Sequence, residues 1–313
     1  MLRIVFMGTP DFALASLKAV DKAGYPILAV VTNPDKPKGR GMKLTLSPVK
    51  EYALERKFPI LQPNKIKNNE ECIDKIRKLK PDVICVVAYG KILPKELLEI
   101  PKLGCINVHG SLLPNYRGAA PIQWAVINGE TNTGITTMYM NEGMDTGDMI
   151  LKKEVEIGRN ETTGELWTRL AKVGADLLVE TLKQIEEGTA PRRKQQGEVS
   201  YAPMLTKQMA KIDWQKSIQE IHNLIRGLNP IMGAYCYLEE KKIKIWKTEI
   251  ISQQEKSEEK PGTIVLADDK EGLLVQAKDG VLKIIEIQEE NTKRMNACDY
   301  IRGRKISAHQ ILL

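Results

Sequence analysis

Short apolar runs alternate with helical patterns through the first half of the chain. The apolar runs cover residues 4–7, 27–31, 83–87 and 105–108. Helical patterns lie between them, over residues 10–23, 49–57, 70–79 and 95–99. Strands that alternate with helices predict right-handed β-α-β units and a mostly parallel sheet covered on both faces. The sequence therefore predicts an α/β, Rossmann-like first domain.

The pattern changes after residue 187. Residues 162–187 predict one long amphipathic helix, and the polar, glycine- and proline-containing stretch that follows predicts a linker. A helical pattern at residues 218–226 then precedes short alternating runs at residues 234–238, 243–250, 263–267, 273–276 and 281–287. Such runs favour a small antiparallel barrel or sandwich. We predict a first domain over residues 1–187, a linker over 188–204 and a second domain over 205–313.

Composition narrows the class of protein. The chain is 42% hydrophobic and 28% charged, as is ordinary for a globular protein, and its net charge of +7 is compatible with a polyanionic partner. Its five cysteines are odd in number, widely spaced and without a C-x-x-C pair, which argues against a disulfide framework. We expect a reduced, cytoplasmic setting. No run reaches the roughly 18 apolar residues of a membrane span, so we expect no membrane partner.

Two common kinds of cofactor site lack their sequence signals. The first strand-to-helix turn, Gly8 to Phe12, has one glycine where a dinucleotide fingerprint needs three, which argues against a nicotinamide cofactor. This turn is compatible with anion binding or with a plain connection. The three histidines are His109, His222 and His309, and the last two fall in the other predicted domain. A zinc cluster is therefore not predicted.

Asn107 and His109 give the strongest local signal. They stand two apart at the carboxyl end of an apolar run, so on a strand they share a face at the edge where open α/β sheets bind ligands. Asp145 lies between glycines further along. From the residues alone, two structural interpretations remain open: Asn107 and His109 as a structural pair, and Asp145 as part of a solvated hairpin turn. A hydrolase triad with Ser111 lacks the G-x-S-x-G elbow.

Two long motifs resemble the folate-dependent formyltransferases. They are residues 104–125 (GCINVHGSLLPNYRGAAPIQWA) and 133–150 (TGITTMYMNEGMDTGDMI). The resemblance extends over the whole chain and is closest to the members that act on tRNA, which have a basic insertion like residues 36–43. The family's second domain is an OB-like β-barrel, and residues 210–214 and 225–230 are similar to its start. The resemblance thus implies that the second domain is an OB-like, tRNA-binding barrel.

The resemblance also implies which residues act. The catalytic residues would be Asn107, His109 and Asp145. The site for 10-formyltetrahydrofolate, the formyl donor, would include Ser111, Leu112, Leu113, Pro114, Val87, Tyr89 and Gly90. The basic insertion would contact the acceptor stem of initiator methionyl-tRNA through Lys36, Lys38, Arg40 and Lys43. We expect a monomeric transferase of translation initiation, without metal or NAD.

In this interpretation, the methionyl α-amino group attacks the formyl carbon. Asn107 and His109 would donate hydrogen bonds to the formyl oxygen, while Asp145 would orient His109 and help to relay a proton through water. Three alternatives share the motifs: a formyltransferase for a small amine, a formyl-folate hydrolase, and a tRNA-binding module that has lost activity. A small-amine enzyme would not need the basic insertion, and the intact Asn107, His109 and Asp145 argue against the inactive module.

Overall fold

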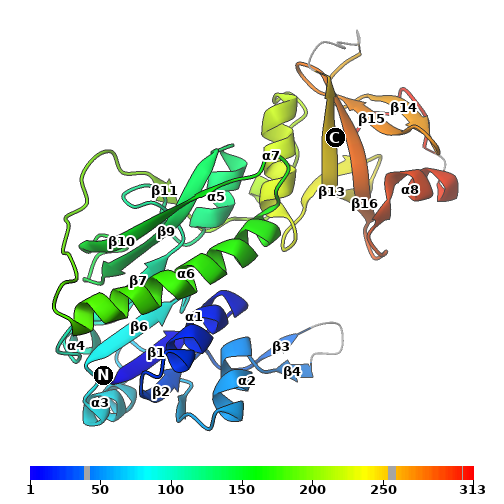
Figure 1. Ribbon diagram of the computed structural model, residues 1–313. Coiled ribbons are helices and arrows are strands. Elements are labelled where there is room, and N and C mark those ends of the chain that lie inside the picture. The colour runs from blue at the N-terminus through cyan, green and yellow to red at the C-terminus, as the bar shows by residue number, and fades with distance from the viewer. Residues whose placement is uncertain (39–42, 253–258, 305) are drawn as a thin grey trace. The chain divides into compact units, whose positions relative to one another are not determined.

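The computed structural model describes residues 1–38, 43–252, 259–304 and 306–313 (Figure 1). Its contacts divide the chain into two compact units. The first consists of Met1–Pro121, Asn132–Glu156 and Trp167–Pro203, and the second of Ile122–Thr131, Ile157–Leu166 and Met204–Leu313. Residues 188–203, predicted as most of the linker, thus count with the first unit. The predicted domain boundaries at residues 187 and 205 stay predictions.

A seven-stranded sheet forms the centre of the first unit. Its order is β10-β9-β7-β6-β1-β2-β5. The strands are β1 (Ile4–Gly8), β2 (Ile27–Val31), β5 (Ile60–Leu61), β6 (Val83–Val87), β7 (Cys105–His109), β9 (Asn132–Tyr139) and β10 (Met149–Glu156). From β7 to β5 every pair is parallel, whereas β9 is antiparallel to both β7 and β10. The predicted mostly parallel α/β sheet is confirmed.

Helices cover both faces of this sheet. The side chains of α3 and α4 pack with Val5 and Met7 of β1 in one apolar cluster. On the opposite face, α6 lies so close to β7 and β9 that a Cβ on Gly174 would meet Val108 at 3.0 Å and Ile135 at 3.7 Å. The helices of this region are α1 (Asp11–Lys22), α2 (Pro48–Glu55), α3 (Glu70–Leu79), α4 (Lys95–Leu98) and α6 (Thr163–Glu186). No helix in the described ranges has the length and apolar character to cross a membrane.

Several elements lie where the sequence pattern did not predict them. The most important is the hairpin of β9 and β10. Strand β9 is buried on both faces and contains Thr133, Thr136 and Thr137, so it shows no clear alternation of apolar and polar residues. The other unpredicted elements are β3 (Lys36–Lys38), β4 (Lys43–Thr45), β5, β8 (Arg117–Gly118), α5 (Pro121–Ile127), β11 (Tyr201–Ala202), the 3₁₀ turn η1 (Gln208–Ala210), β17 (Met295–Asn296) and α8 (Ala297–Gly303).

The second unit contains an antiparallel sheet that closes into a barrel, as predicted. Its strands run in the order β12-β13-β16-β15-β14, and β17 pairs with β16. Residues Ile311 and Leu312 bridge β12 at Leu238 and the start of β14 at Thr263, so they join the two edges of the sheet. The main elements are α7 (Ile218–Leu228), β12 (Ala234–Leu238), β13 (Lys241–Ser252), β14 (Ile264–Asp268), β15 (Gly272–Gln276) and β16 (Val281–Glu289).

The closure of the barrel gives a test of stability. Leu312 is 4% exposed and packs in the barrel core, whereas Leu313 is 61% exposed. We expect Leu312→Ala to lower the free energy of unfolding of the second unit by about 2–5 kcal/mol, because it leaves a cavity. Leu313→Ala should change it by less than about 0.5 kcal/mol. Urea unfolding followed by tryptophan fluorescence and circular dichroism measures both. Equal effects of the two substitutions would contradict this account of closure.

Candidate active site

Asn107 and His109 occupy the carboxyl end of β7. In the register of the sheet, Asn107 pairs with Val86 of β6 and with Met138 of β9, and His109 pairs with Thr136 of β9. Strand β7 therefore lies between a parallel and an antiparallel neighbour. The two side chains share a face, as their spacing predicted. His109 is 5% exposed and Asn107 is half-buried.

The hairpin between β9 and β10 brings Asp145 to this strand end. Asp145 has a φ of 53°, a left-handed conformation that is uncommon outside glycine. Gly147 allows the tight return of the chain, because a Cβ there would lie 1.7 Å from the carbonyl oxygen of Tyr139. The side chain of Asn141 accepts hydrogen bonds from the N–H of Gly143 and from Oγ1 of Thr146, and so stabilises the turn.

The three predicted catalytic side chains converge on one carboxylate oxygen. Oδ1 of Asp145 lies 3.5 Å from Nδ2 of Asn107 and 3.6 Å from Nδ1 of His109. Its Oδ2 accepts a hydrogen bond of 2.8 Å from the N–H of Gly118. Both Oδ1 distances exceed the normal 2.7–3.2 Å of an N–H···O hydrogen bond. The amide of Asn107 and Nδ1 of His109 are therefore close to Asp145 without a short hydrogen bond to it, and both remain available to a substrate.

The hydrogen bond of His109 to the backbone identifies its protonated nitrogen. Nε2 lies 3.0 Å from the carbonyl oxygen of Tyr116. A carbonyl oxygen can only accept, so Nε2 carries a hydrogen and donates it. Nδ1, which faces Asp145, is then the ring nitrogen without a hydrogen in the neutral ring. This arrangement points the reactive nitrogen of His109 toward Asp145 and Asn107.

The segment from Ser111 to Pro114 is fixed by hydrogen bonds to its backbone. Oγ1 of Thr136 donates to the carbonyl of Ser111 at 2.7 Å and accepts from the N–H of Leu113 at 3.1 Å. The buried Ser111 hydroxyl donates to the carbonyl of Asn115. Because that hydroxyl is engaged there and not with His109, the geometry disfavours Ser111 as a nucleophile. Leu112 and Pro114 are half-buried, and Leu113 is fully buried.

The predicted folate-binding residues at the end of β6 and in the turn after it differ in their exposure to solvent. The side chains of Val87 and Tyr89 are buried in the sheet core, at 0% and 1% exposed. As whole residues they are closed to a ligand, so the exposed positions of this turn are the ones that can contact it. Gly90 is exposed, and so is Ala88, which has a φ of 45° and belongs to the stretch that resembles the folate-pocket lining of the family. This turn presents main chain rather than side chains.

Part of the basic insertion forms regular secondary structure. Lys36–Lys38 and Lys43–Thr45 form an antiparallel ribbon in which Lys36 pairs with Thr45, and Lys38 with Lys43. The predicted tRNA-binding insertion therefore begins and ends in short paired strands, with Lys36 and Lys38 on one and Lys43 on the other. Arg40 lies outside the described residues. The ribbon exposes Lys36 as well as Leu44, an apolar side chain that is 72% exposed.

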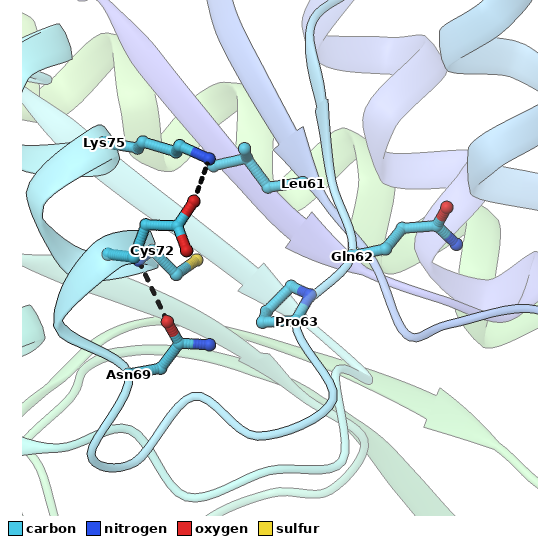
Figure 2. A pocket seen from close by; sticks show the side chains of 7 residues that line it. Leu61, Gln62, Pro63, Asn69, Cys72 and Lys75 are labelled. Carbon is cyan, nitrogen blue, oxygen red and sulfur yellow. Dashed lines mark hydrogen bonds and ion pairs between the residues drawn. The ribbon is translucent and has the colours of Figure 1, made fainter.

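A separate small pocket lies beside α3 (Figure 2). It has a volume of about 220 Å³. Its polar groups largely bind one another: Lys75 pairs with Glu71 at 2.6 Å, and Asn69 accepts from the N–H of Cys72 at 3.0 Å. Burial raises the pKa of the Cys72 thiol, which disfavours the reactive thiolate. None of the predicted site residues lines this pocket.

Comparison with known proteins identifies the family. The formyl transferase model matches residues 2–182, and the model for the formyl transferase C-terminal domain matches residues 204–305. The chain belongs to the formyl transferase family.

The chain is also similar over nearly its whole length to individual members of the family. The chain is 55% identical over 312 residues to a methionyl-tRNA formyltransferase of Clostridioides difficile (strain 630), covering 99% of this chain and 100% of the relative. It is 52% identical to the methionyl-tRNA formyltransferase of Ruminiclostridium cellulolyticum, over 99% of each.

Solved structures of more distant proteins share the fold. The sugar 3N-formyl transferase WlaRD matches with a TM-score of 0.65 at 21% identity, over 94% of this chain and 99% of that one. An N-formyltransferase from Helicobacter canadensis matches with a TM-score of 0.65 at 21% identity, over 91% and 99%.

The tautomer of His109 can be tested directly. We expect the ¹H–¹⁵N spectrum of the imidazoles to show Nε2 of His109 carrying a hydrogen when the ring is neutral, since the Tyr116 carbonyl accepts from it. The chain has three histidines, so His109→Gln assigns the signals. A neutral ring with its hydrogen on Nδ1 would contradict the geometry described above.

Proposed function

We propose that this enzyme transfers a formyl group from 10-formyltetrahydrofolate to the α-amino group of initiator methionyl-tRNA, as a monomer in the cytoplasm. The observation that carries the proposal is the convergence of Asn107, His109 and Asp145 at the end of β7. Membership of the formyl transferase family and the full-length similarity to methionyl-tRNA formyltransferases support the donor and the acceptor.

The residues of the site suit a folate beside the strand end. The exposed turn at Ala88 and Gly90 offers main-chain groups, and the fixed segment from Ser111 to Pro114 offers apolar surface at Leu112 and Pro114. A ligand with a flat, partly polar ring needs both kinds of contact. We assign these two segments to the formyl donor.

Asn107 and His109 supply hydrogen-bond donors to the reacting carbonyl. When the amine adds to the formyl carbon, the formyl oxygen gains negative charge. The amide of Asn107 and the protonated Nδ1 of His109 can both donate to it. Because both groups are fixed beforehand, little reorganisation is needed, and one such donor can be worth about 10²–10³ in rate.

Asp145 is assigned to proton handling and to orientation. The attacking α-amino group has an ordinary pKa of about 7.7–8.0, so a useful fraction is neutral without a strong base. After attack the amine nitrogen must lose a proton, and as the tetrahedral intermediate collapses the bond from the formyl carbon to N10 of the folate breaks and N10 takes up a proton. The carboxylate of Asp145, half-buried beside Nδ1 of His109, is assigned to receive the proton of the amine through water.

The basic ribbon is assigned to the tRNA. Its exposed Lys36 can contact backbone phosphates, and the residue assigned to the acceptor stem is Arg40, which lies between the two strands in the sequence and outside the described residues. A two-stranded ribbon is narrow enough to present a few side chains to the end of a stem.

The catalytic assignment predicts large rate losses. We expect Asn107→Ala and Asp145→Ala each to lower the single-turnover rate of formylation of initiator methionyl-tRNA by about 10²-fold or more. Asn115→Ala, in an exposed position of the adjacent loop, is the matched control and should retain the wild-type rate. Rapid-quench assays with labelled formyl donor measure all three. Near-wild-type rates in both site variants would remove these residues from catalysis.

The tRNA assignment predicts a selective loss of affinity. Arg40→Ala should raise KM for the tRNA and weaken its salt dependence by about one unit of slope, because one cation near phosphate is lost. Binding of the folate, followed by fluorescence, should not change. Lys78→Ala removes an exposed charge from α3 and serves as control. Unchanged formylation by Arg40→Ala, or a parallel loss of folate binding, would contradict the assignment.

A further inference from the structure

Gln195, in the stretch predicted as a linker, makes side-chain contacts with the active-site hairpin. Its Nε2 donates to the carbonyl oxygen of Asp145 at 2.7 Å and to that of Gly147 at 2.9 Å. Both acceptors belong to the turn that carries the catalytic carboxylate. The amide group of Gln195 thus donates one hydrogen to each of two carbonyl oxygens in the same turn.

Arg117 fixes the orientation of this amide. Its Nε and Nη2 both donate to Oε1 of Gln195, at 3.0 and 2.7 Å. A guanidinium can only donate, so the oxygen of the amide must face Arg117 and the nitrogen must face the hairpin. The next residue, Gly118, donates its N–H to Oδ2 of Asp145. Gly118 therefore holds the side chain of Asp145 directly, and Arg117 holds the backbone of Asp145 through Gln195.

The backbone on either side of Gln195 is anchored without its side chain. Arg193 and Met149 exchange two backbone hydrogen bonds, of 2.8 and 3.0 Å. On the other side, the N–H of Arg117 donates to the carbonyl of Ser200 at 2.9 Å. Substitution of Gln195 should therefore leave the course of the segment in place and remove only its contacts with the hairpin.

The conformation of Asp145 explains why such contacts are needed. A non-glycine residue in the left-handed region costs roughly 1 kcal/mol or more and persists only where its surroundings enforce it. The hydrogen bond from Gln195 to the carbonyl of Asp145 orients the peptide group that follows this φ of 53°. Without it, the hairpin can relax and the carboxylate can move away from His109.

We propose that Gln195, oriented by Arg117, is a positioning residue for the formyl-transfer reaction, holding Asp145 in its left-handed conformation against His109 and Asn107. The proposal rests on the proposed function of Asp145. Gln195 touches no reacting atom and acts only through the hairpin. Its loss should therefore reduce kcat and leave KM for the folate and for the tRNA unchanged.

Three variants of the full-length chain separate positioning from a general structural role. Gln195→Ala removes all four hydrogen bonds. Gln195→Glu keeps an acceptor, now charged, for Arg117 but places an oxygen against the carbonyls of Asp145 and Gly147. Gln196→Ala changes the exposed neighbour and is the matched control. Steady-state formylation and thermal unfolding are measured for each, together with Gln195→Ala in an Asp145→Ala background.

We expect Gln195→Ala to lower kcat by about 10- to 100-fold, Gln195→Glu to lower it at least as much, and Gln196→Ala to retain it. Melting temperatures should change little. In the Asp145→Ala background, Gln195→Ala should add less than about a twofold loss, since its effect passes through Asp145.

Equal losses in both backgrounds would overturn the proposal. So would full activity in Gln195→Glu, because anchoring to Arg117 alone would then suffice. A wild-type kcat in Gln195→Ala would also overturn it. A wild-type enzyme that does not formylate tRNA would instead count against the proposed function.

Discussion

The hydrogen bond from the N–H of Gly118 to Oδ2 of Asp145 joins two parts of the first unit that are distant in sequence. One is the loop that follows β7, and the other is the turn between β9 and β10. Because β9 is hydrogen-bonded along β7, the hairpin can reach the strand end where Asn107 and His109 lie. The bond leaves Oδ1 directed at the two donors. The shape of the candidate site depends on this constraint.

The chemistry of the site depends on the polar atoms of Asn107, His109 and Asp145 that have no short hydrogen bond within the protein. Nε2 of His109 is hydrogen-bonded to Tyr116 and Oδ2 of Asp145 to Gly118, while Oδ1 of Asp145 lies 3.5 Å from the amide of Asn107 and 3.6 Å from Nδ1 of His109. Fixed donors at such separations can stabilise charge that develops on a substrate oxygen without first breaking strong internal bonds. Glycines at the close approaches allow the backbone to hold this geometry. The same closeness leaves little tolerance for a Cβ at Gly118, where one would lie 2.6 Å from the carbonyl oxygen of Ala202.

Much of the fold could be predicted from the sequence because the central strands are continuous apolar runs. The runs that became β1, β2, β6 and β7 gave the parallel sheet, and the shared face of Asn107 and His109 followed from their spacing. The proximity of Asp145 came from the resemblance to a known family and not from the pattern. Strand β9, buried on both faces and rich in threonine, has no periodicity to detect.

Other features could not be predicted from the sequence, because the groups that make the contacts leave no pattern in it. Tyr116 and Gly118 act through backbone groups, which every residue possesses, so their side chains give no signal. Gln195 reaches carbonyls 50 and 48 positions away, a contact that only the folded chain defines. The two strands that flank residues 39–42 are each three residues long, with lysines and a proline, a composition more typical of a loop.

The most direct test of the account is a comparison of acceptors for one labelled formyl group. Wild-type enzyme with 10-formyltetrahydrofolate is offered charged initiator tRNA, charged elongator methionyl-tRNA, small primary amines, or water alone. We expect rapid labelling of the initiator methionyl-tRNA, much slower labelling of the elongator and the small amines, and negligible release of formate. Preferential labelling of a small amine, or hydrolysis at a comparable rate, would contradict it.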